Sequence, residues 1–481
     1  MDSRQFQILY ADTDGACRWQ RITSAIETGM QTGRLRPGDA LPTQRELAAA
    51  LGLTTGTVTR GYAEAMRRGL TTAVPGRGTF ISSERQDRMP LGVETVPPRL
   101  CPSPEDGAKT NLGFIAPFDY LDPPLHQALA NIAARLSSAE AADLQTCRRP
   151  AGLDRHREAG SLWARRYGVP AAGRDLLICA GAQHALMVTL ISLCSPADRV
   201  AVESLSYPLI RHLAWRLRLG LAPIRTDIWG MLPDALESAC RNGGIRAVYL
   251  MPSCRNPTLT HMPARRRQEI TEVCRRHNVL IIEDDVYALT AASEDATPPF
   301  AVLAPERTCF IAATSEILGG GLRIAYLIPP QEYFDELERT VSYTVSMVPP
   351  LMAELASQWI ADGTADRVLA AKNEEAALRN AAARTIFDGR SLMTRNTGYF
   401  CWLPLPETIP ATSFVAEAAR QGVIVAGGSH FMMGHAPQEN GIRIALGGQK
   451  HRQQLTDALH KLAALLESDS CPPGSACGKK D

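Results

Sequence analysis

The stretch AATSEILGGGLRIAY, residues 312–326, lies between two apolar segments that we expect to be β-strands. The first segment ends at Ile311 and the second begins at Ile324. Between them stand two hydroxyl side chains, a run of glycines and Arg323. Glycine lets a backbone approach a ligand closely, and an arginine beside hydroxyl groups suits a phosphate. This stretch therefore predicts an anion-binding turn between two strands.

The chain around this stretch, from residue 111 to residue 467, alternates apolar strands with helical patterns. The predicted strands are Leu176–Cys179, Arg199–Val202, Ala247–Met251, Val279–Ile282 and Thr308–Ile311. Such alternation is typical of an α/β domain built on a mostly parallel sheet. Because ligands of such sheets bind beyond the carboxyl ends of the strands, we expect functional side chains directly after each strand.

Polar or glycine-containing segments do follow the predicted strands. They read CAGAQHAL at 179–186, VESLSYP at 202–208, MPSCRNPT at 251–258 and IIEDDVY at 281–287, and a later segment reads GIRIAL at 441–446. The first opens a helix at a glycine, where main-chain N–H groups favour phosphate. The Asn-Pro pair of the third is also simply a good turn. The acids of the fourth need partners, since unpaired buried carboxylates are costly; a metal site is an alternative, but no nearby His or Cys spacing supports it.

These segments, in this order, resemble the cofactor-binding pattern of fold-type I aminotransferases, enzymes that use pyridoxal phosphate (PLP). The resemblance implies a phosphate site made by Gly181, Ala182, Gln183, Ser315 and Arg323. It also implies a ring site made by Tyr207 as the stacked ring, Asn256 and Tyr287 at the ring hydroxyl, and Asp284 at the ring nitrogen. Arg443 matches the arginine that clamps the carboxylate of a substrate or effector.

The departure from this pattern with the largest chemical consequence is at a single position. In the enzymes a serine is followed by a lysine and, seven residues later, by an arginine. Here Ser315 and Arg323 are present, but Glu316 stands in the place of the lysine. The lysine amine binds the cofactor covalently, which a glutamate cannot do. We therefore expect no catalytic residue and no aminotransferase activity in this domain.

Three explanations of Glu316 remain open: a degenerate scaffold, a pocket that holds its ligand noncovalently, and an engineered or erroneous change, since lysine and glutamate codons differ by one base. Two further positions depart from the patterns: Ala313 stands where the enzymes often have another phosphate-binding serine, and Gly320 replaces a proline that is common in regulators that carry an aminotransferase-like domain. The candidate residues of the phosphate and ring sites are nevertheless retained, which argues against full degeneration: Tyr207, Asn256, Asp284, Tyr287, Ser315 and Arg323. A noncovalent ligand would be PLP, pyridoxamine phosphate (PMP) or an amino-acid-derived molecule. An ionised Glu316 would favour the charged amine of PMP over the aldehyde of PLP, unless burial raised its pKa or an arginine paired with it.

The N-terminal part of the chain predicts a different fold. A helical pattern covers residues 18–32, and Thr43 with Glu46 forms a capping-box pattern at the start of a second helix. A third helix begins at Thr54 or Thr55, and a glycine-tipped hairpin follows it. Three helices followed by such a hairpin are typical of a winged helix-turn-helix domain.

Three segments of this part, GRLRPGDALPTQRELA at 33–48, TVTRGY at 57–62 and GRGTF at 76–80, resemble the signature of GntR-type repressor domains. The resemblance implies binding to double-stranded DNA. The candidate contact residues are Thr43, Arg45, Thr55, Thr57, Arg60, Gly76 and Arg77. Arginines at a helix N-terminus, on a recognition helix and on a wing suit phosphate and groove contacts. The alternative is a solvated face whose arginines contact no nucleic acid.

The segments together predict a winged helix-turn-helix domain at 15–82, a proline-containing linker at 83–110, an aminotransferase-like domain at 111–467 and a disordered tail at 468–481. A GntR-type head joined to an aminotransferase-like body resembles MocR-type regulators. The resemblance implies a transcriptional regulator that is a head-to-tail homodimer and senses a small-molecule effector. The rival hypothesis is an active PLP-dependent aminotransferase with an accessory head, which Glu316 disfavours.

Composition adds a few limits. The chain has 481 residues and a net charge of +1, which argues neither for nor against nucleic acid. Its twelve cysteines are scattered without a Cys-x-x-Cys motif, which is typical of reduced thiols. We recognise no secretory signal and no run long enough to span a membrane, so we expect a cytoplasmic protein without membrane contact.

Overall fold

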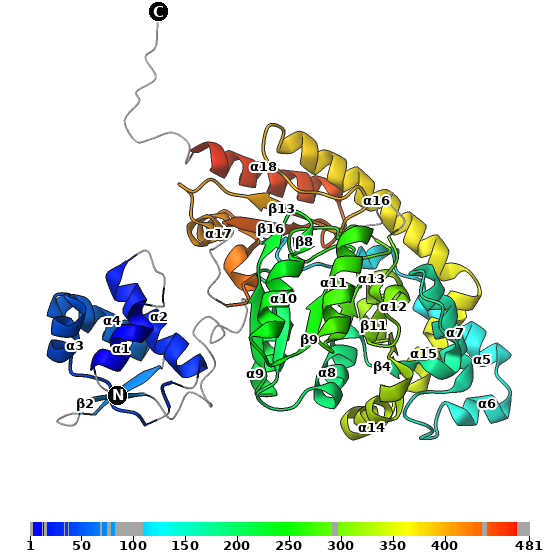
Figure 1. The fold of residues 1–481 in the computed structure, drawn as a ribbon. Helices are drawn as coiled ribbons and strands as arrows, with labels where there is room; N and C mark the ends of the chain where they lie inside the picture. The colour runs from blue at the N-terminus through cyan, green and yellow to red at the C-terminus, as the bar shows by residue number, and fades with distance from the viewer. Residues whose placement is uncertain are drawn as a thin grey trace, which may run out of the picture. The chain divides into compact units, whose positions relative to one another are not determined.

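The computed structural model describes residues 3–11, 13, 17–32, 34–36, 38–67, 70–74, 78–81, 109–290, 297–434 and 440–468. The chain divides into two compact units, Met1–Pro98 and Arg99–Asp481 (Figure 1). Of the predicted linker only residues 109–110 are described, and Thr110 already belongs to a short strand. Of the predicted tail only Ser468 is described, as the end of the last helix. The domain limits themselves stay a prediction.

The N-terminal unit contains the predicted helices and hairpin. Its elements are α1 Ser3–Ala11, α2 Arg18–Gln31, α3 Gln44–Leu51, α4 Thr55–Arg67, β1 Thr71–Val74 and β2 Gly78–Ile81. The patterns did not predict α1. Thr43 caps α3: its Oγ1 accepts a hydrogen bond from Glu46 N over 3.3 Å, and its own N–H donates to the Glu46 carboxylate over 2.9 Å. A Cβ on Gly61 would lie 2.9 Å from Cβ of Ile22, so glycine allows α2 and α4 to cross closely.

The C-terminal unit is built on a seven-stranded sheet in the order β4-β12-β11-β10-β9-β5-β6. The strands are β4 Leu177–Cys179, β12 Ala325–Ile328, β11 Thr308–Ala313, β10 Leu280–Asp284, β9 Ile245–Leu250, β5 Arg199–Glu203 and β6 Gly220–Ile224. β12 is antiparallel to both of its neighbours, and the other neighbouring pairs are parallel. The predicted α/β class with a mostly parallel sheet is therefore confirmed.

Helices cover both faces of this sheet, because alternate residues of its strands are apolar on opposite sides. Cys309 and Ile311 of β11 pack with α8 Ala182–Leu193, α9 Pro208–Arg216 and α14 Phe334–Val345. Phe310 and Ala312 pack on the other side with α5 Leu125–Arg135, α7 Asp154–Arg166 and α15 Pro350–Ala361. The remaining helices before α16 are α6 Ser138–Asp143, α10 Pro233–Arg241, α11 Ala264–Arg276, α12 Phe300–Leu303 and α13 Ser315–Leu318.

A second, antiparallel sheet has the order β13-β16-β15 and carries α17 and α18. Its elements and the short strand pairs beside it are β13 Phe400–Pro404, β15 Ala426–Gly427, β16 Gly441–Ala445, α17 Ala411–Arg420, α18 Arg452–Ser468, β3 Thr110–Asn111 with β14 Val423–Ile424, and β7 Thr226–Asp227 with β8 Gly230–Met231. Within the described ranges, no helix has both the length and the apolar character needed to cross a membrane.

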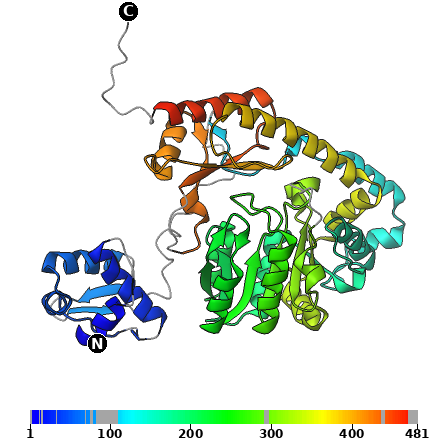
Figure 2. The same ribbon diagram turned by 45° about the horizontal axis from the view of Figure 1, so that its top comes forward.

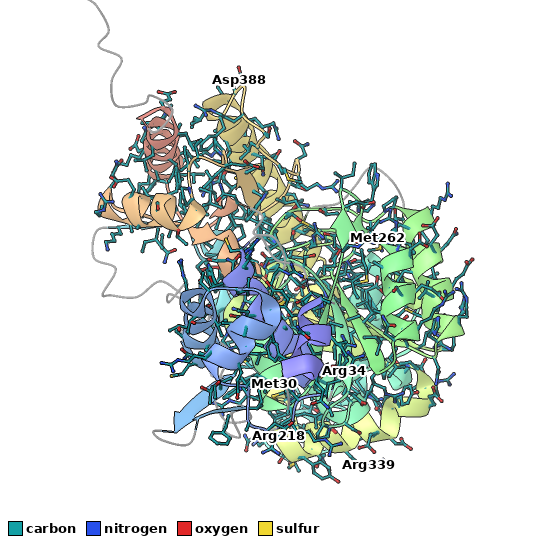
Figure 3. All side chains as sticks on the ribbon, turned by 60° about the vertical axis from the view of Figure 1, so that its left-hand side comes forward. Met30, Arg34, Arg218, Met262, Arg339 and Asp388 are labelled. Carbon is teal, nitrogen blue, oxygen red and sulfur yellow. The ribbon has the colours of Figure 1, made fainter. Side chains whose placement is uncertain are left out.

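The long helix α16, Thr364–Ile386, connects the regions around the two sheets (Figure 2). Its Val368 packs with α7 and α15, its Ala376 joins the core of the large sheet, and its Ala383 joins the core of the second sheet. Asp388 lies just beyond its end and Arg339 lies on α14 (Figure 3). Side chains in the middle of α16 are therefore positioned beside the connection between β11 and β12.

Candidate functional site

The phosphate-binding residues expected from the sequence come together at the start of α8. Because β12 runs antiparallel to β4, with Ala325 opposite Cys179, the turn before β12 lies beside the turn after β4. Gly181 has a positive φ of 83°, and a Cβ there would overlap the guanidinium of Arg323. Arg323 is exposed and has no hydrogen-bond or ion-pair partner in the described part of the chain. An unpaired guanidinium at a helix N-terminus can bind an anion such as phosphate.

The other members of this group occupy neighbouring positions. Ala182 and Gln183 are the first residues of α8, and Ser315 is the first residue of α13. His184, which sequence reasoning did not single out, shapes the turn: its Nδ1 accepts a hydrogen bond from Ala180 N over 3.0 Å. Burial lowers the pKa of His184, which keeps the ring neutral and able to accept that bond.

Two of the three acids at the end of β10 have structural partners. Glu283 accepts hydrogen bonds from the main-chain N–H groups of Phe300 and Ala301, over 3.0 and 2.9 Å. Asp285 accepts from the main-chain N–H of Ser253 over 3.0 Å and from its hydroxyl. The searched residues hold no group of three or more His, Cys, Asp or Glu side chains that could bind a metal ion. These two carboxylates are thus accounted for by the fold.

Asp284, between them, is different. Its Oδ2 accepts a hydrogen bond from Tyr249 Oη over 2.6 Å, but its buried Oδ1 has no partner. Burial raises the pKa of Asp284 to about 7. A buried carboxylate oxygen without a donor is suited to a ligand that brings a charged N–H group.

The ring of Tyr207 stands among the candidate residues. Tyr207 is the residue directly before α9 and is half-buried. Burial raises its pKa, and the charges of Asp284 and Glu316 raise it further, while Arg323 and Arg443 oppose them. The predicted ring, acids and arginines therefore share one electrostatic environment.

Arg443 and Asn256 are in direct contact. From β16, Arg443 Nη1 donates a hydrogen bond to Asn256 Oδ1 over 2.8 Å, and its Nη2 donates to the main-chain oxygen of Gly113. Its guanidinium lies 4.8 Å from the ring centroid of Phe431, and its buried Nε has no partner. Burial lowers the pKa of Arg443 to about 10, so the group remains charged at neutral pH.

Glu316 is the second residue of α13. The residue is partly exposed, but its Oε2 is buried and has no hydrogen-bond partner. Burial raises its pKa to about 7; Lys372 and Arg323 lower it, and Asp119 raises it. No arginine pairs with Glu316 in the part of the chain that the structure describes. No arginine therefore closes the site within those residues. Burial does raise the pKa of Glu316, which is the condition under which the expected ionisation at neutral pH is weakened.

Lys372 is a residue that the sequence patterns missed. It lies fully buried on α16, and its Nζ donates hydrogen bonds to Asp122 Oδ1 over 2.6 Å and to the main-chain oxygen of Glu316 over 3.4 Å. A sequence signal existed: Lys372 falls four residues after Val368 and four before Ala376, on the apolar stripe of its helix. A charged residue on such a stripe requires a buried partner.

Two tyrosines complete the surroundings of Glu316. Tyr287, expected from the sequence, is buried with its ring centroid 5.2 Å from that of Phe400; burial and then Glu316 raise its pKa. Tyr399, which was not expected, is also buried, and its hydroxyl has no partner. Burial, Glu316 and Asp122 raise the pKa of Tyr399.

The candidate DNA-binding residues that are described lie on one succession of elements in the N-terminal unit. Arg45 is exposed on the first turn of α3, and Thr55 and Arg60 are exposed on α4. Thr57 is half-buried, and its hydroxyl lies 2.9 Å from that of Thr54. The predicted contacts Gly76 and Arg77 are outside the described residues.

Arg45 and Arg60 have no competing acid among the described residues. Arg45 has no carboxylate partner within the described ranges, and the guanidinium of Arg60 lies 4.8 Å from the ring centroid of Trp19. Thr59 Oγ1 donates to Gln44 Oε1 over 2.7 Å and ties α4 to the start of α3. Two neighbouring helices thus present unpaired cations to solvent, which suits a phosphate backbone.

Comparison with known proteins connects both units to families. Residues 119–462 match the family described as aminotransferase class I and II, and residues 19–81 match the bacterial regulatory proteins of the gntR family. YdeF, an uncharacterized HTH-type transcriptional regulator of Bacillus subtilis, is 29% identical, with 93% of this chain and 94% of its own covered. PdxR, an HTH-type pyridoxine biosynthesis transcriptional regulator of Corynebacterium glutamicum, is 28% identical, with 64% of this chain and 65% of its own covered.

A solved structure of kynurenine aminotransferase from Pyrococcus horikoshii, in complex with PMP, has a similar fold. The match has a TM-score of 0.72 and 20% identity, and it covers 82% of this chain and 98% of that chain.

Proposed function

Because the chain belongs to the aminotransferase class I and II family and carries a gntR-type segment, we propose that it is a DNA-binding transcriptional regulator. Its aminotransferase-like unit binds a small ligand noncovalently and performs no transamination. One observation carries this proposal: Glu316, at the expected lysine position, has a buried oxygen without a partner. A glutamate cannot bind the cofactor covalently, but it can hold an amine by charge.

The DNA-binding half of the proposal is supported by the N-terminal unit. Unpaired arginines on α3 and α4 suit phosphate contacts, and Thr55 and Thr57 lie on the first turn of the helix expected in the major groove. The relatives named above as HTH-type regulators support the same role. A DNA partner implies action in the cytoplasm, and repeated half-sites would call for a homodimer, the head-to-tail arrangement being our expectation.

A PLP- or PMP-type ligand fits the residues present. Three of the buried polar atoms that lack a partner belong to residues expected to contact the ligand: Asp284 Oδ1, Glu316 Oε2 and Arg443 Nε. Gly181 leaves the space for an approach beside Arg323 that any Cβ would fill. When bound, PMP supplies a phosphate, a basic ring nitrogen and a primary amine. These groups match an unpaired cation and unpaired carboxylate oxygens.

Different residues would contact the phosphate, the ring and the carboxylate of the bound molecules. The phosphate would be held by Gly181, Ala182, Gln183, Ser315 and Arg323. The ring would be held by Tyr207, Asn256, Tyr287 and Asp284. Arg443 would hold an effector carboxylate with the N–H groups that Asn256 and Gly113 leave free. An ionised Asp284 would accept a hydrogen bond from the protonated ring nitrogen of the ligand, so that the proton stays on the nitrogen and not on the carboxylate.

We further propose that the site prefers PMP to PLP. The ammonium of Lys372, paired with Asp122, holds a fixed positive charge near Glu316 and favours the ionised form of that carboxylate. The protonated amine of PMP would favour the ionised form of Glu316 further, whereas the aldehyde of PLP would not. Charge-assisted hydrogen bonds contribute roughly 1.5–3 kcal/mol, which corresponds to a preference of about tenfold or more.

The second candidate function is an active PLP-dependent aminotransferase with an accessory head. The fold favours it, but its chemistry needs a free lysine amine. Lys372 is brought near Glu316, yet its ammonium is paired with Asp122 and buried. Borohydride treatment after incubation with PLP, followed by peptide mapping, tests it. We expect no modified pocket lysine; a stoichiometric adduct on Lys372 would establish the enzyme hypothesis instead.

Selection of duplexes from a randomised DNA library with the full chain tests the proposed function itself. We expect enrichment of one sequence with repeated half-sites, and a change of its affinity when PMP is added. The absence of any enriched sequence contradicts the regulator, while enrichment without a PMP effect contradicts only the assigned ligand.

A further inference from the structure

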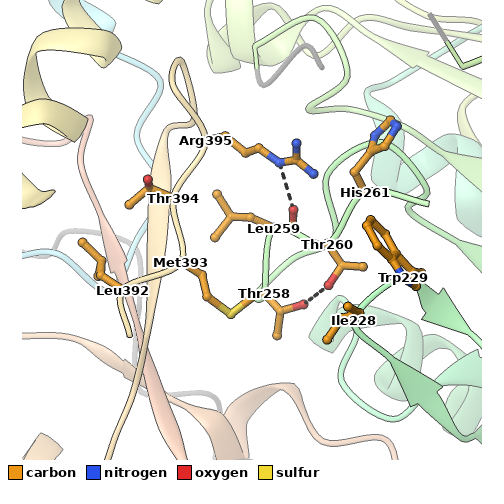
Figure 4. Close-up of a pocket in the computed structure, with 10 residues that line it drawn as sticks. All are labelled: Ile228, Trp229, Thr258, Leu259, Thr260, His261, Leu392, Met393, Thr394 and Arg395. Carbon is orange, nitrogen blue, oxygen red and sulfur yellow. Dashed lines mark hydrogen bonds between the residues drawn. The ribbon is translucent and has the colours of Figure 1, made fainter. Parts of the chain in front are cut away.

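A cavity of about 340 Å³ opens in the C-terminal unit, and its lining contains none of the residues expected to hold the cofactor (Figure 4). Its walls come from three segments: the β7–β8 turn at 228–229, the loop at 258–261, and the residues 392–395 that precede β13. The first two segments belong to the region of the large sheet, and the third leads into the second sheet. Its volume is within the range of small-molecule sites, about 300–1,000 Å³.

The cavity has one positive charge and no lining carboxylate among the residues described. Arg395 Nε donates a hydrogen bond to the main-chain oxygen of Leu259 over 3.2 Å, which fixes the direction of the guanidinium. Its terminal nitrogens have no partner in the described ranges and point toward the side on which Trp229 and His261 lie (Figure 4). A half-buried guanidinium that is oriented but unpaired is suited to a carboxylate.

The histidine in the wall does not compete for this anion. His261 Nδ1 donates to the main-chain oxygen of Ser253 over 3.2 Å, and its Nε2 lies 3.1 Å from Thr297 Oγ1. Burial lowers the pKa of His261, so the ring is neutral and both nitrogens are used. The charge that a ligand meets in the cavity is therefore that of Arg395.

Part of the remaining wall is apolar. Trp229 is 49% exposed and Ile228 is 76% exposed at the tip of the β7–β8 turn, while Met393 lies across the cavity from Trp229 (Figure 4). Exposed apolar side chains beside a cavity mark a surface that a ligand can cover. An indole stacks on planar rings, and a thioether makes favourable contacts with them.

From this combination we infer a second ligand-binding site that takes a planar aromatic carboxylate. The carboxylate pairs with the terminal nitrogens of Arg395, and the ring lies against Trp229 and Met393. The hydroxyls of Thr258 and Thr260 accept hydrogen bonds from Arg255 and lie 3.0 Å from each other, so one of them donates to the other. This inference stands independently of the cofactor proposal, since it uses none of the same side chains.

Calorimetric titration of the full chain with 2-naphthoate and its uncharged analogue 2-naphthamide tests the site. We expect one saturable site per chain and at least tenfold tighter binding of the carboxylate. R395Q should bring the two affinities to within about twofold, because the glutamine cannot pair with the carboxylate as an ion. R390Q removes the same charge from an exposed arginine near α16 that does not line the cavity, and it should leave the preference unchanged.

W229A supplies a second, independent check on the exposed turn, and it should weaken both probes by at least fivefold. Equal affinity of the two probes for the wild-type chain would overturn the inference without any variant. A preference that survives in R395Q, or that disappears equally in R390Q, would overturn the assignment to this cavity.

Discussion

Lys372 Nζ lies 2.6 Å from Asp122 Oδ1, which places a fixed ion pair directly beneath the turn that carries Glu316. The lysine is fully buried, whereas the side chain of Asp122 keeps 27% of its exposure. A Cβ on Gly319 would lie 2.8 Å from Asp122 Oδ2, so the glycine run that follows Glu316 also lies against this pair. The pair therefore couples α16 to the turn between β11 and β12.

Removal of the lysine should destabilise the fold. In K372M the carboxylate of Asp122 loses its partner, and we expect the free energy of unfolding to fall by about 1–3 kcal/mol, less than for a fully buried pair because Asp122 is partly solvated. D122N/K372M should cost less than the sum of the two single variants. Urea unfolding of the four proteins measures this coupling, and strict additivity would show that the pair contributes nothing.

Glu316 should reduce the stability of the ligand-free protein. Burial raises its pKa from 4.5 to about 7, so the folded chain retains a proton that the unfolded chain releases at lower pH. Below about pH 4.5 the side chain is protonated in both states, so its burial costs the folded chain no ionisation penalty. As pH rises through 7 that advantage is lost, and the free energy of unfolding falls. E316Q should therefore exceed the wild type by about 1–3 kcal/mol at pH 8 and by much less at pH 5.

Urea unfolding at both pH values measures this difference, with E407Q as the control, since Glu407 is exposed. An E316Q protein that is no more stable than the wild type at pH 8 would mean that Glu316 finds a partner in solution. A residue that binds a ligand often lowers the stability of the ligand-free protein. A carboxylate that destabilises the free chain and then pairs with a bound amine would behave in this way.

Much of the fold follows from the sequence because its signals are local. The apolar strand ending at Cys179 had a turn glycine two residues after it, and Thr43 with Glu46 marked the start of α3. The boundaries moved by one or two residues; β10, for example, extends to Asp284 because the acids that end it are buried and bonded. α1 was missed because it lies before the patterns that define the domain.

The site was predictable only where chain order matched a known pattern. The contact of Arg323 with Gly181 follows from the antiparallel position of β12 next to β4, which residue spacing does not reveal. Lys372 and Tyr399 come from distant segments that meet Glu316 only in the fold. Arg395 was missed for the same reason, because its cavity is closed by segments more than a hundred residues apart in the sequence.

DNA binding by the N-terminal unit should depend on the two exposed arginines of α3 and α4. In R45A and R60A we expect weaker binding to every duplex, with the slope of log affinity against log salt reduced by about one unit for each lost phosphate contact. R265A, which removes an exposed arginine from α11 in the other unit, is the matched control. Fluorescence anisotropy at several salt concentrations measures both quantities, and an unchanged slope in the double variant would remove this face from the interface.

Replacement of Glu316 by lysine should restore covalent binding of PLP. E316K should bind PLP covalently, because the groups expected to hold the phosphate and the ring are retained. The visible absorption of lysine-bound PLP reports the bond, and its loss on borohydride reduction, followed by peptide mapping, locates the adduct at position 316. E316Q serves as the uncharged control. A colourless E316K protein in excess PLP would instead support a degenerate scaffold.

Calorimetric titration of the wild type and of E316Q with PMP and with PLP, at pH 8, tests the central claim most directly. We predict that the wild type binds PMP at least about tenfold more tightly than PLP, and that E316Q binds the two with similar affinity. Equal affinities of the wild type for the two vitamers, or binding of neither, would contradict the account.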